Sequence, residues 1–114
     1  MVICMLSFQL DSLSSRELYK DVLVRLIHGN ELTLNYFELK SGDVSIPFHK
    51  HPVEHFVYVL DGEIEFKYKD KKLILQEKMG FFLPANTIHS ARVICAPVRA
   101  LEIFTIVDDE YYET

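Results

Sequence analysis

Short runs of alternating apolar and polar residues, each followed by a turn signal, recur along this chain. The clearest run covers residues 63–68, where Ile64, Phe66 and Tyr68 alternate with charged side chains. Successive side chains of a β-strand point to opposite faces, so this pattern predicts a strand with one buried face. A glycine and an asparagine separate two further runs, at 22–27 and 32–39, which indicates a β-hairpin.

The remaining elements are expected at similarly short intervals. We expect strands at 56–60, 81–84, 91–95 and 101–106, a return strand beginning at 73, and turns at Asp61-Gly62 and 69–71. Residues 13–18 place hydroxyl side chains before a possible helical turn, so at most one short helix is expected there. Many short strands without a long helical pattern favour an all-β sandwich or barrel of the jelly-roll kind.

The length of the chain predicts a single domain. With 114 residues there is no room for a second domain. A domain of this size buries about two-thirds of its unfolded surface, which is enough for a core without disulfides. Hydrophobic residues make up 49% of the chain and charged residues 25%, as in globular proteins. We therefore expect one domain over residues 1–114.

Charge and cysteine content limit the partners and the compartment. The net charge is −5 and no basic stripe is present, which argues against a nucleic-acid partner. No apolar run reaches the roughly 18 residues that cross a membrane, and the first residues lack the basic region of a signal peptide. Cys4 and Cys95 do not make a disulfide framework. We expect a cytoplasmic protein with reduced thiols and no membrane partner.

Three histidines lie close together in the sequence, at His49, His51 and His55. Residues two apart on a strand share a face, so His49 and His51 project together. Pro52 interrupts a regular strand, and a bend there would let His55 point back from the start of the next strand. Neutral imidazoles are common ligands of zinc, iron, copper, manganese and nickel ions. This stretch therefore predicts one side of a metal site.

Another histidine follows a proline-containing turn. Pro84 ends a strand, Asn86 suits a left-handed conformation, and His89 opens the next strand, where it is the only polar side chain on an apolar inner face. Two other interpretations stay open from the residues alone. A lone histidine on a strand is more often a hydrogen-bonded core residue, which is how we interpret His28. The cluster that begins at His49 could also be an exposed polar loop.

Together, these two segments resemble the two sequence motifs of the cupin superfamily. In the first motif a glycine is followed by His-x-His, a glutamate and a second glycine. Its counterparts here are Gly42, His49, His51, His55 in place of the glutamate, and Gly62. The second motif ends Pro-x-Gly-x-x-His, which residues 84–89 match with an asparagine in place of the glycine. The resemblance covers residues 42–93.

The chain departs from the family pattern at several positions. Gly42 stands one residue early, Lys78 occupies a position where a glycine is expected, and Val93 replaces the final asparagine. These are scaffold positions, so they affect loop detail more than the site. Glu54 is a rival to His55 as a ligand, but on an extended chain it points away from His55.

The resemblance implies a fold and a metal site. The fold is an all-β cupin barrel, a double-stranded β-helix or jelly roll of about six to eight strands, with a short N-terminal extension. Its mouth would hold one divalent transition metal ion per chain, of which zinc, iron, manganese and nickel are candidates. The ligands would be His49, His51, His55 and His89, leaving one or two positions for water or a small-molecule substrate.

The whole chain is similar to small cupins of pectin and alginate breakdown, the KdgF type. These enzymes open the ring of 4,5-unsaturated uronates to give linear keto sugars. Their metal site is accompanied by a carboxylate and a phenylalanine two residues apart on a late strand. The resemblance implies that Glu102 moves the proton, that Phe104 packs against the sugar, and that His55 replaces a glutamine ligand. The substrate class implied is a small sugar-derived or keto acid.

Alternatives to this function remain open at the level of sequence. The strand pattern alone slightly favours Glu102 facing solvent, with Leu101 and Ile103 in the core. Arg92 and Arg99 are candidate anchors for a substrate carboxylate or ordinary surface residues. An iron-dependent dioxygenase and a ligand-binding cupin without turnover are alternative functions. Small cupins are often homodimers, so we also expect a homodimer.

Overall fold

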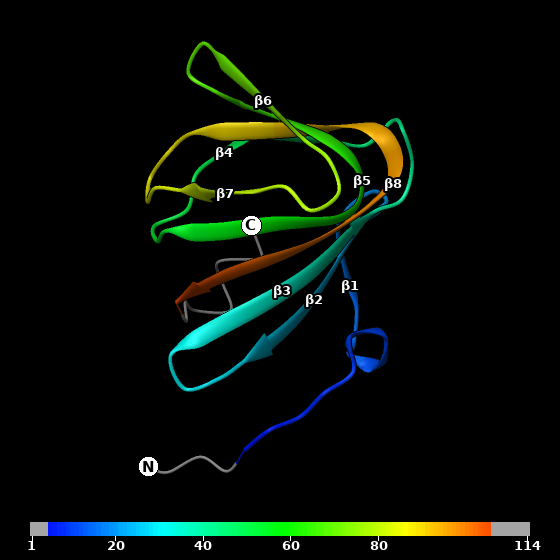
Figure 1. The fold of residues 1–114 in the computed structure, drawn as a ribbon, viewed down its shortest axis with the longest axis vertical. Helices are drawn as coiled ribbons and strands as arrows, with labels where there is room; N and C mark the ends of the chain where they lie inside the picture. The colour runs from blue at the N-terminus through cyan, green and yellow to red at the C-terminus, as the bar shows by residue number, and fades with distance from the viewer. Residues whose placement is uncertain (1–4, 106–114) are drawn as a thin grey trace.

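The computed structural model describes residues 5–105 as an antiparallel β-structure (Figure 1). A short 3₁₀ helix, η1 (Leu10–Ser12), precedes the strands. The strands are β1 (Arg16–Tyr19), β2 (Val22–His28), β3 (Leu32–Leu39), β4 (Ser45–His49), β5 (His55–Tyr68), β6 (Lys71–Leu75), β7 (Gly80–Leu83) and β8 (His89–Thr105). The predicted hairpin of β2 and β3 is confirmed, as is the all-β fold class.

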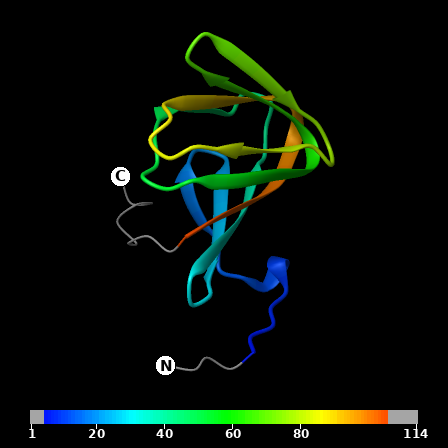
Figure 2. The ribbon, with the colours of Figure 1, turned by 60° about the vertical axis from the view of Figure 1, so that its left-hand side comes forward.

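Two long strands, β5 and β8, each belong to two layers. The first half of β5 pairs with the second half of β8, and β1, β2, β3 and β7 extend this pair into the first sheet. The second half of β5 pairs with the first half of β8, and β4 and β6 complete the second sheet. The turned view in Figure 2 shows the two layers meeting where β5 and β8 bend. This is the jelly-roll arrangement that the sequence predicted.

The core lies between the two sheets and follows the alternation of the strands. Inward positions of both sheets supply its buried side chains: Val22, Val24, Phe37, Leu39, Val44, Val57, Val59, Ile64, Phe66, Leu75, Ala91, Val93, Val98 and Ala100. Branched aliphatic residues dominate because they pack well on a pleated surface. On β3 the inward face also contains Thr33 and Asn35, so this face is polar toward one end of the barrel and apolar toward the other.

The predicted turn at Asp61-Gly62 is wrong. β5 passes through this dipeptide without ending, and its pairing with β8 shifts register between Val59 and Ile64. Gly62 takes a φ of +84° there, which bends the strand from the first sheet into the second. The strands predicted at 91–95 and 101–106 are likewise one bent strand, β8, within the residues described.

At most one short helix was expected over residues 13–18, and the structure has none there. A single 3₁₀ turn lies earlier, at Leu10–Ser12, and Arg16 begins β1 instead. Leu18 and Tyr19 pack against the core from β1, so burial of these side chains outweighs the local helical signal.

Two further expectations from the sequence concern membrane-spanning segments and the cysteines. Within residues 5–105, no helix has the length and apolar character needed to cross a membrane. Cys95 is an exposed thiol, whereas Cys4 lies outside the described residues.

We expect Gly62→Ala to lower the free energy of unfolding by about 2–4 kcal/mol. A Cβ at this position would lie 2.3 Å from the carbonyl oxygen of Pro97 and 2.8 Å from that of Cys95, and the positive φ adds strain. Gly42→Ala is the matched control, because a Cβ there meets nothing within 4 Å. Urea unfolding of the three proteins measures both effects. Equal stability of the two variants would contradict this account of the bend.

Candidate metal centre

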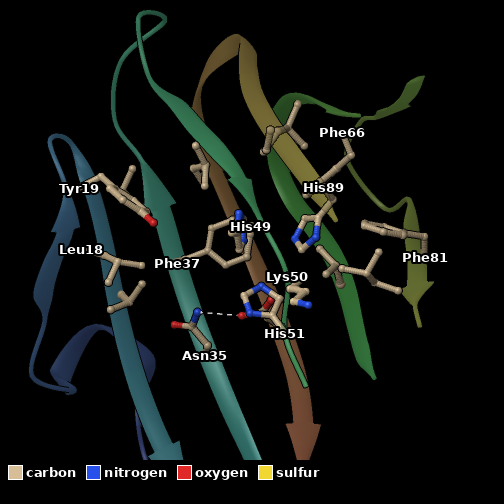
Figure 3. Close-up of a pocket in the computed structure, with 18 residues that line it drawn as sticks. Leu18, Tyr19, Asn35, Phe37, His49, Lys50, His51, Phe66, Phe81 and His89 are labelled. Atoms are coloured by element: carbon tan, nitrogen blue, oxygen red, sulfur yellow. Dashed lines mark hydrogen bonds between the residues drawn. The ribbon is translucent and has the colours of Figure 1, made fainter. Parts of the chain in front are cut away.

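Four histidines converge at one end of the barrel, where strands of both sheets begin or end. Figure 3 shows three of them, His49, His51 and His89. His49 is the last residue of β4 and His89 the first of β8, and these two are paired in register. His55 is the first residue of β5, in the first sheet, and His51 lies in the loop between β4 and β5. The bend expected at Pro52 therefore does return His55 toward the preceding histidines.

The potential ligand atoms form two groups that share one residue. His49, His51 and His89 offer nitrogen atoms that all lie within 4.8 Å of one another. His51, His55 and Glu102 form a second group by the same measure. The ring centroids of His49 and His89 are 4.2 Å apart, and those of His51 and His55 are 4.4 Å apart. His49 and His89 lie on strands of the second sheet, whereas His55 and Glu102 lie on strands of the first sheet. His51 lies between these two pairs.

Backbone hydrogen bonds orient three of the rings. Each Nδ1 contacts the carbonyl oxygen two residues earlier, at 2.7 Å in His49, 2.9 Å in His55 and 2.9 Å in His89. A carbonyl only accepts, so in the neutral ring Nδ1 carries the proton and donates it, which leaves the Nε2 lone pair unprotonated. Metal-bound histidines in proteins are commonly oriented in this way, by a hydrogen bond from the ring nitrogen that does not bind the metal.

The loop before His89 is tied to the loop that carries His51. The backbone N–H of Asn86 donates to the carbonyl oxygen of His51 at a distance of 2.6 Å. Asn86 has a φ of 62°, as its predicted left-handed conformation requires. This contact joins the two sequence segments that supply the histidines, which are far apart in the chain.

Burial keeps three of the histidines neutral. It lowers the pKa of His51 to about 2, with further lowering by the neighbouring histidines. Burial also lowers the pKa of His55 and that of His89 to about 4, against the opposing effect of the carbonyl that each ring donates to. Neutral imidazoles are the form that binds metal ions, so protons compete weakly at this site.

Glu102 faces the histidines, and the interpretation that it faces solvent is wrong. Its Oε2 lies 3.7 Å from Nε2 of His55, and its Oε1 accepts a hydrogen bond of 3.1 Å from Nδ2 of Asn35. Asn35 and Val57 are its cross-strand neighbours on β3 and β5. The register of β8 in the middle of the first sheet, which its own sequence does not reveal, turns this carboxylate inward.

A cavity of about 140 Å³ opens beside the histidines. This volume has room for several waters or a small organic molecule. Its polar lining consists of Tyr19, Asn35, His49, Lys50, His51, His89 and Glu102, and the rest is apolar. Arg92 and Arg99 are not among its lining residues; they bind Glu65 and Asp61 instead.

Phe104 also takes a position that differs from its expected role. It is 3% exposed, is not among the residues that line the cavity, and packs against His55 with the two rings tilted and their centroids 4.5 Å apart. In this geometry Phe104 supports a candidate ligand and does not present its ring to a ligand in the cavity.

Comparison with known proteins identifies the family. A family model described as "Cupin domain" matches residues 35–104, which is more than half of the chain. The chain belongs to the cupin family. A comparison with curated proteins gives no match.

Solved cupin structures share the fold over nearly the whole chain. The structure of KdgF from Halomonas sp. superposes with a TM-score of 0.83 at 17% identity, covering 94% of this chain and 98% of that one. The polyketide cyclase RemF from Streptomyces resistomycificus gives 0.77 at 20%, covering 96% and 92%. A RmlC-like cupin from Shewanella frigidimarina NCIMB 400 gives 0.76 at 18%, covering 92% and 93%. At these identities the likeness shows the cupin fold alone.

The cupin's sequence did not single out two of the residues that line the cavity. Lys50 lies between two predicted ligands, but strand alternation would point it the other way; β4 ends at His49, so that rule does not apply. Asn35 shares the inward face of β3 with Phe37 and Leu39, and this polar residue in an apolar row was the available signal.

We expect the metal-free cupin to lose stability as the pH falls from about 6.5 toward 5. In the unfolded chain the histidines take up protons near their ordinary pKa, whereas the folded pKa of His55 and that of His89 lie at about 4. The unfolded state therefore binds more protons in this window, which favours unfolding. Urea unfolding after chelation measures the slope, and His51→Gln should reduce it. A slope unchanged by His51→Gln would contradict the prediction.

Proposed function

We propose that this cupin is a metal-dependent enzyme that opens the ring of 4,5-unsaturated uronates to linear keto sugars. The observation that carries the proposal is the position of Glu102, whose carboxylate lines the cavity beside the histidine cluster. A carboxylate so placed can move a proton on a molecule bound at the cluster. The resemblance to KdgF-type cupins supplies the substrate class.

The donor set fits a divalent transition metal ion. The residues that would hold it are His49, His51 and His89, with His55 as a further ligand, because their rings meet at one end of the barrel and three of them keep Nε2 unprotonated. When bound, such an ion polarises a substrate oxygen and stabilises negative charge on it. The element stays open among zinc, iron, manganese and nickel.

Glu102 accounts for the proton movements of the reaction. It takes the proton of the anomeric hydroxyl, the bond between the anomeric carbon and the ring oxygen breaks, and an aldehyde and an enolate form. Glu102 then returns the proton to the enolate, at the double-bond carbon that does not bear the oxygen. The oxygen-bearing carbon thereby becomes a ketone. One proton leaves and one returns, so the product is an isomer of the substrate and no co-reactant is consumed.

Lys50 suits the carboxylate of a uronate. It is exposed at the edge of the cavity, and among the residues that line the cavity it is the one lysine or arginine. An ammonium there can attract an anionic sugar without interrupting the apolar lining. Phe104 has a supporting role in this proposal, because it packs against His55.

The test is an assay with a 4,5-unsaturated monouronate. Loss of the ultraviolet absorbance of its double bond, with the keto product identified by NMR, should proceed faster with the metal-loaded protein than without protein. Chelation should return the rate to the uncatalysed value, and re-addition of the metal should restore it. A rate unchanged by protein would contradict the proposal. Oxygen uptake by an iron-loaded sample would then indicate the dioxygenase, and tight binding without turnover the ligand-binding cupin.

We further propose that the protein is a homodimer through the outer face of the first sheet. Five apolar residues form one cross-strand row on this face: Ile27, Leu34, Ile103, Phe56 and Phe82. Phe82 is 67% exposed, and the row continues into a groove that Leu6 and Phe8 of the N-terminal segment line. The apolar row and the N-terminal segment belong to the same chain. A second copy related by a two-fold axis can therefore cover the row and the segment in one interface.

We expect sedimentation analysis to give a dimer for the wild type and a monomer for Phe82→Glu. A charge within an apolar contact is costly to bury, so it should raise the dissociation constant by at least about 100-fold. Ile74→Glu is the control, because Ile74 is an exposed apolar residue on β6 of the other sheet. A monomeric wild type, or equal dissociation of both variants, would contradict this interface.

A further inference from the structure

A buried amide holds the carboxylate that faces the metal centre. Asn35 lies directly opposite Glu102 on the neighbouring strand and is 3% exposed. Its Nδ2 donates to Oε1 of Glu102 at 3.1 Å (dashed line in Figure 3). The opposite orientation of the amide would place two acceptors against each other, so the hydrogen bond itself fixes which atom faces Glu102.

The other end of the same amide has no partner. Oδ1 of Asn35 is buried and accepts no hydrogen bond within residues 5–105. A buried acceptor without a partner destabilises the fold, and an apolar side chain of similar size would avoid that cost. The next inward residues of β3, Phe37 and Leu39, are apolar. Packing alone therefore does not explain an asparagine at this position.

We propose that Asn35 is a positioning residue that acts through Glu102. By holding Oε1 it restricts the carboxylate to one orientation and leaves Oε2 directed to His55 and the metal centre. The catalytic part of this inference rests on the proposed function, whereas the restraint on Glu102 does not. A loss of stability that serves to orient one side chain is expected where that side chain has a function.

Asn35→Leu tests the inference, because leucine has a similar volume and cannot donate. On the uronate substrate we expect kcat to fall by about 10–100-fold with KM within about twofold, as for other supporting partners of a site. The melting temperature should change little, since the removal of the orphaned acceptor offsets the loss of the hydrogen bond to the partly exposed Glu102. A structural role predicts the opposite, namely a fall of about 5 °C or more, and that result would overturn the inference.

A second measurement does not depend on the substrate. We expect the visible absorption spectrum of the Co²⁺-loaded protein to change in Asn35→Leu, because a released carboxylate can approach the metal. In the Glu102→Gln background the same substitution should leave the spectrum unchanged, since Asn35 acts through Glu102. Identical spectra of the wild type and Asn35→Leu would overturn the inference. If uronates are not converted but the spectra behave as expected, the proposed function fails and the positioning role stands.

Discussion

The double variant His51→Ala, His89→Ala is expected to contain no metal, whereas the wild type purified without an affinity tag contains about one divalent ion per chain. The two substitutions remove two of the three nitrogens in one ligand group and also the residue that both groups share. The remaining imidazoles, His49 and His55, belong to different sheets and no longer have His51 between them, so they cannot hold an ion against water. Elemental mass spectrometry measures the metal content directly.

The control for this experiment is His28→Ala. His28 contacts the hydroxyl oxygen of Thr33 at 2.7 Å and belongs to neither ligand group, so its loss should leave the metal content unchanged. Circular dichroism of the double variant should still show the β-fold, since the core residues are untouched. A wild type that stays empty after incubation with several divalent ions would contradict the metal centre.

Glu102→Gln is expected to reduce turnover of the unsaturated uronate by about 10²–10⁴-fold while the metal content stays that of the wild type. Glutamine keeps the shape of the side chain and an oxygen that can accept from Asn35, but it cannot take up a proton at neutral pH. The loss should appear in kcat, because the proton moves in the chemical step and not in binding. Steady-state kinetics with elemental analysis of the same samples separates the two effects.

Glu63→Gln is the matched control for this prediction. Glu63 lies on β5 outside the cavity, where it accepts a hydrogen bond of 3.3 Å from Gln76. Its replacement should leave kcat within about twofold of the wild type. A Glu102→Gln protein that retains full turnover would show that another group moves the proton.

Strand alternation was enough to predict much of the fold, because one face of each strand is buried. The bounds of β3 follow directly from its pattern, and the spacing of His49, His51 and His55 predicted their convergence. The bend at Gly62 was not predictable in this way. Asp-Gly is the same signal in a hairpin turn and in a strand that crosses from one sheet to another, and only the pairing with β8 separates the two.

The residues of the candidate site were likewise only partly predictable from the sequence. Histidines in a spaced cluster are recognisable in sequence, because few other roles require that pattern. The inward orientation of Glu102 and the amide of Asn35 depend on the register between β3 and β8, and these strands are separated by most of the chain. A shift of one residue between the two strands would turn Glu102 away from Asn35, so the sequence of either strand alone does not reveal this contact.

The bent strands give the barrel two unequal ends. At one end β5 and β8 run without interruption from one sheet into the other, so the layers are joined by covalent chain. At the opposite end His49 and His89 belong to one layer, His55 and Glu102 to the other, and no strand crosses there within residues 5–105. An ion shared by these groups would hold the two layers together at the open end, opposite the end where the chain itself joins them. Metal content would then set how wide the mouth of the barrel can open, as well as what chemistry takes place in it.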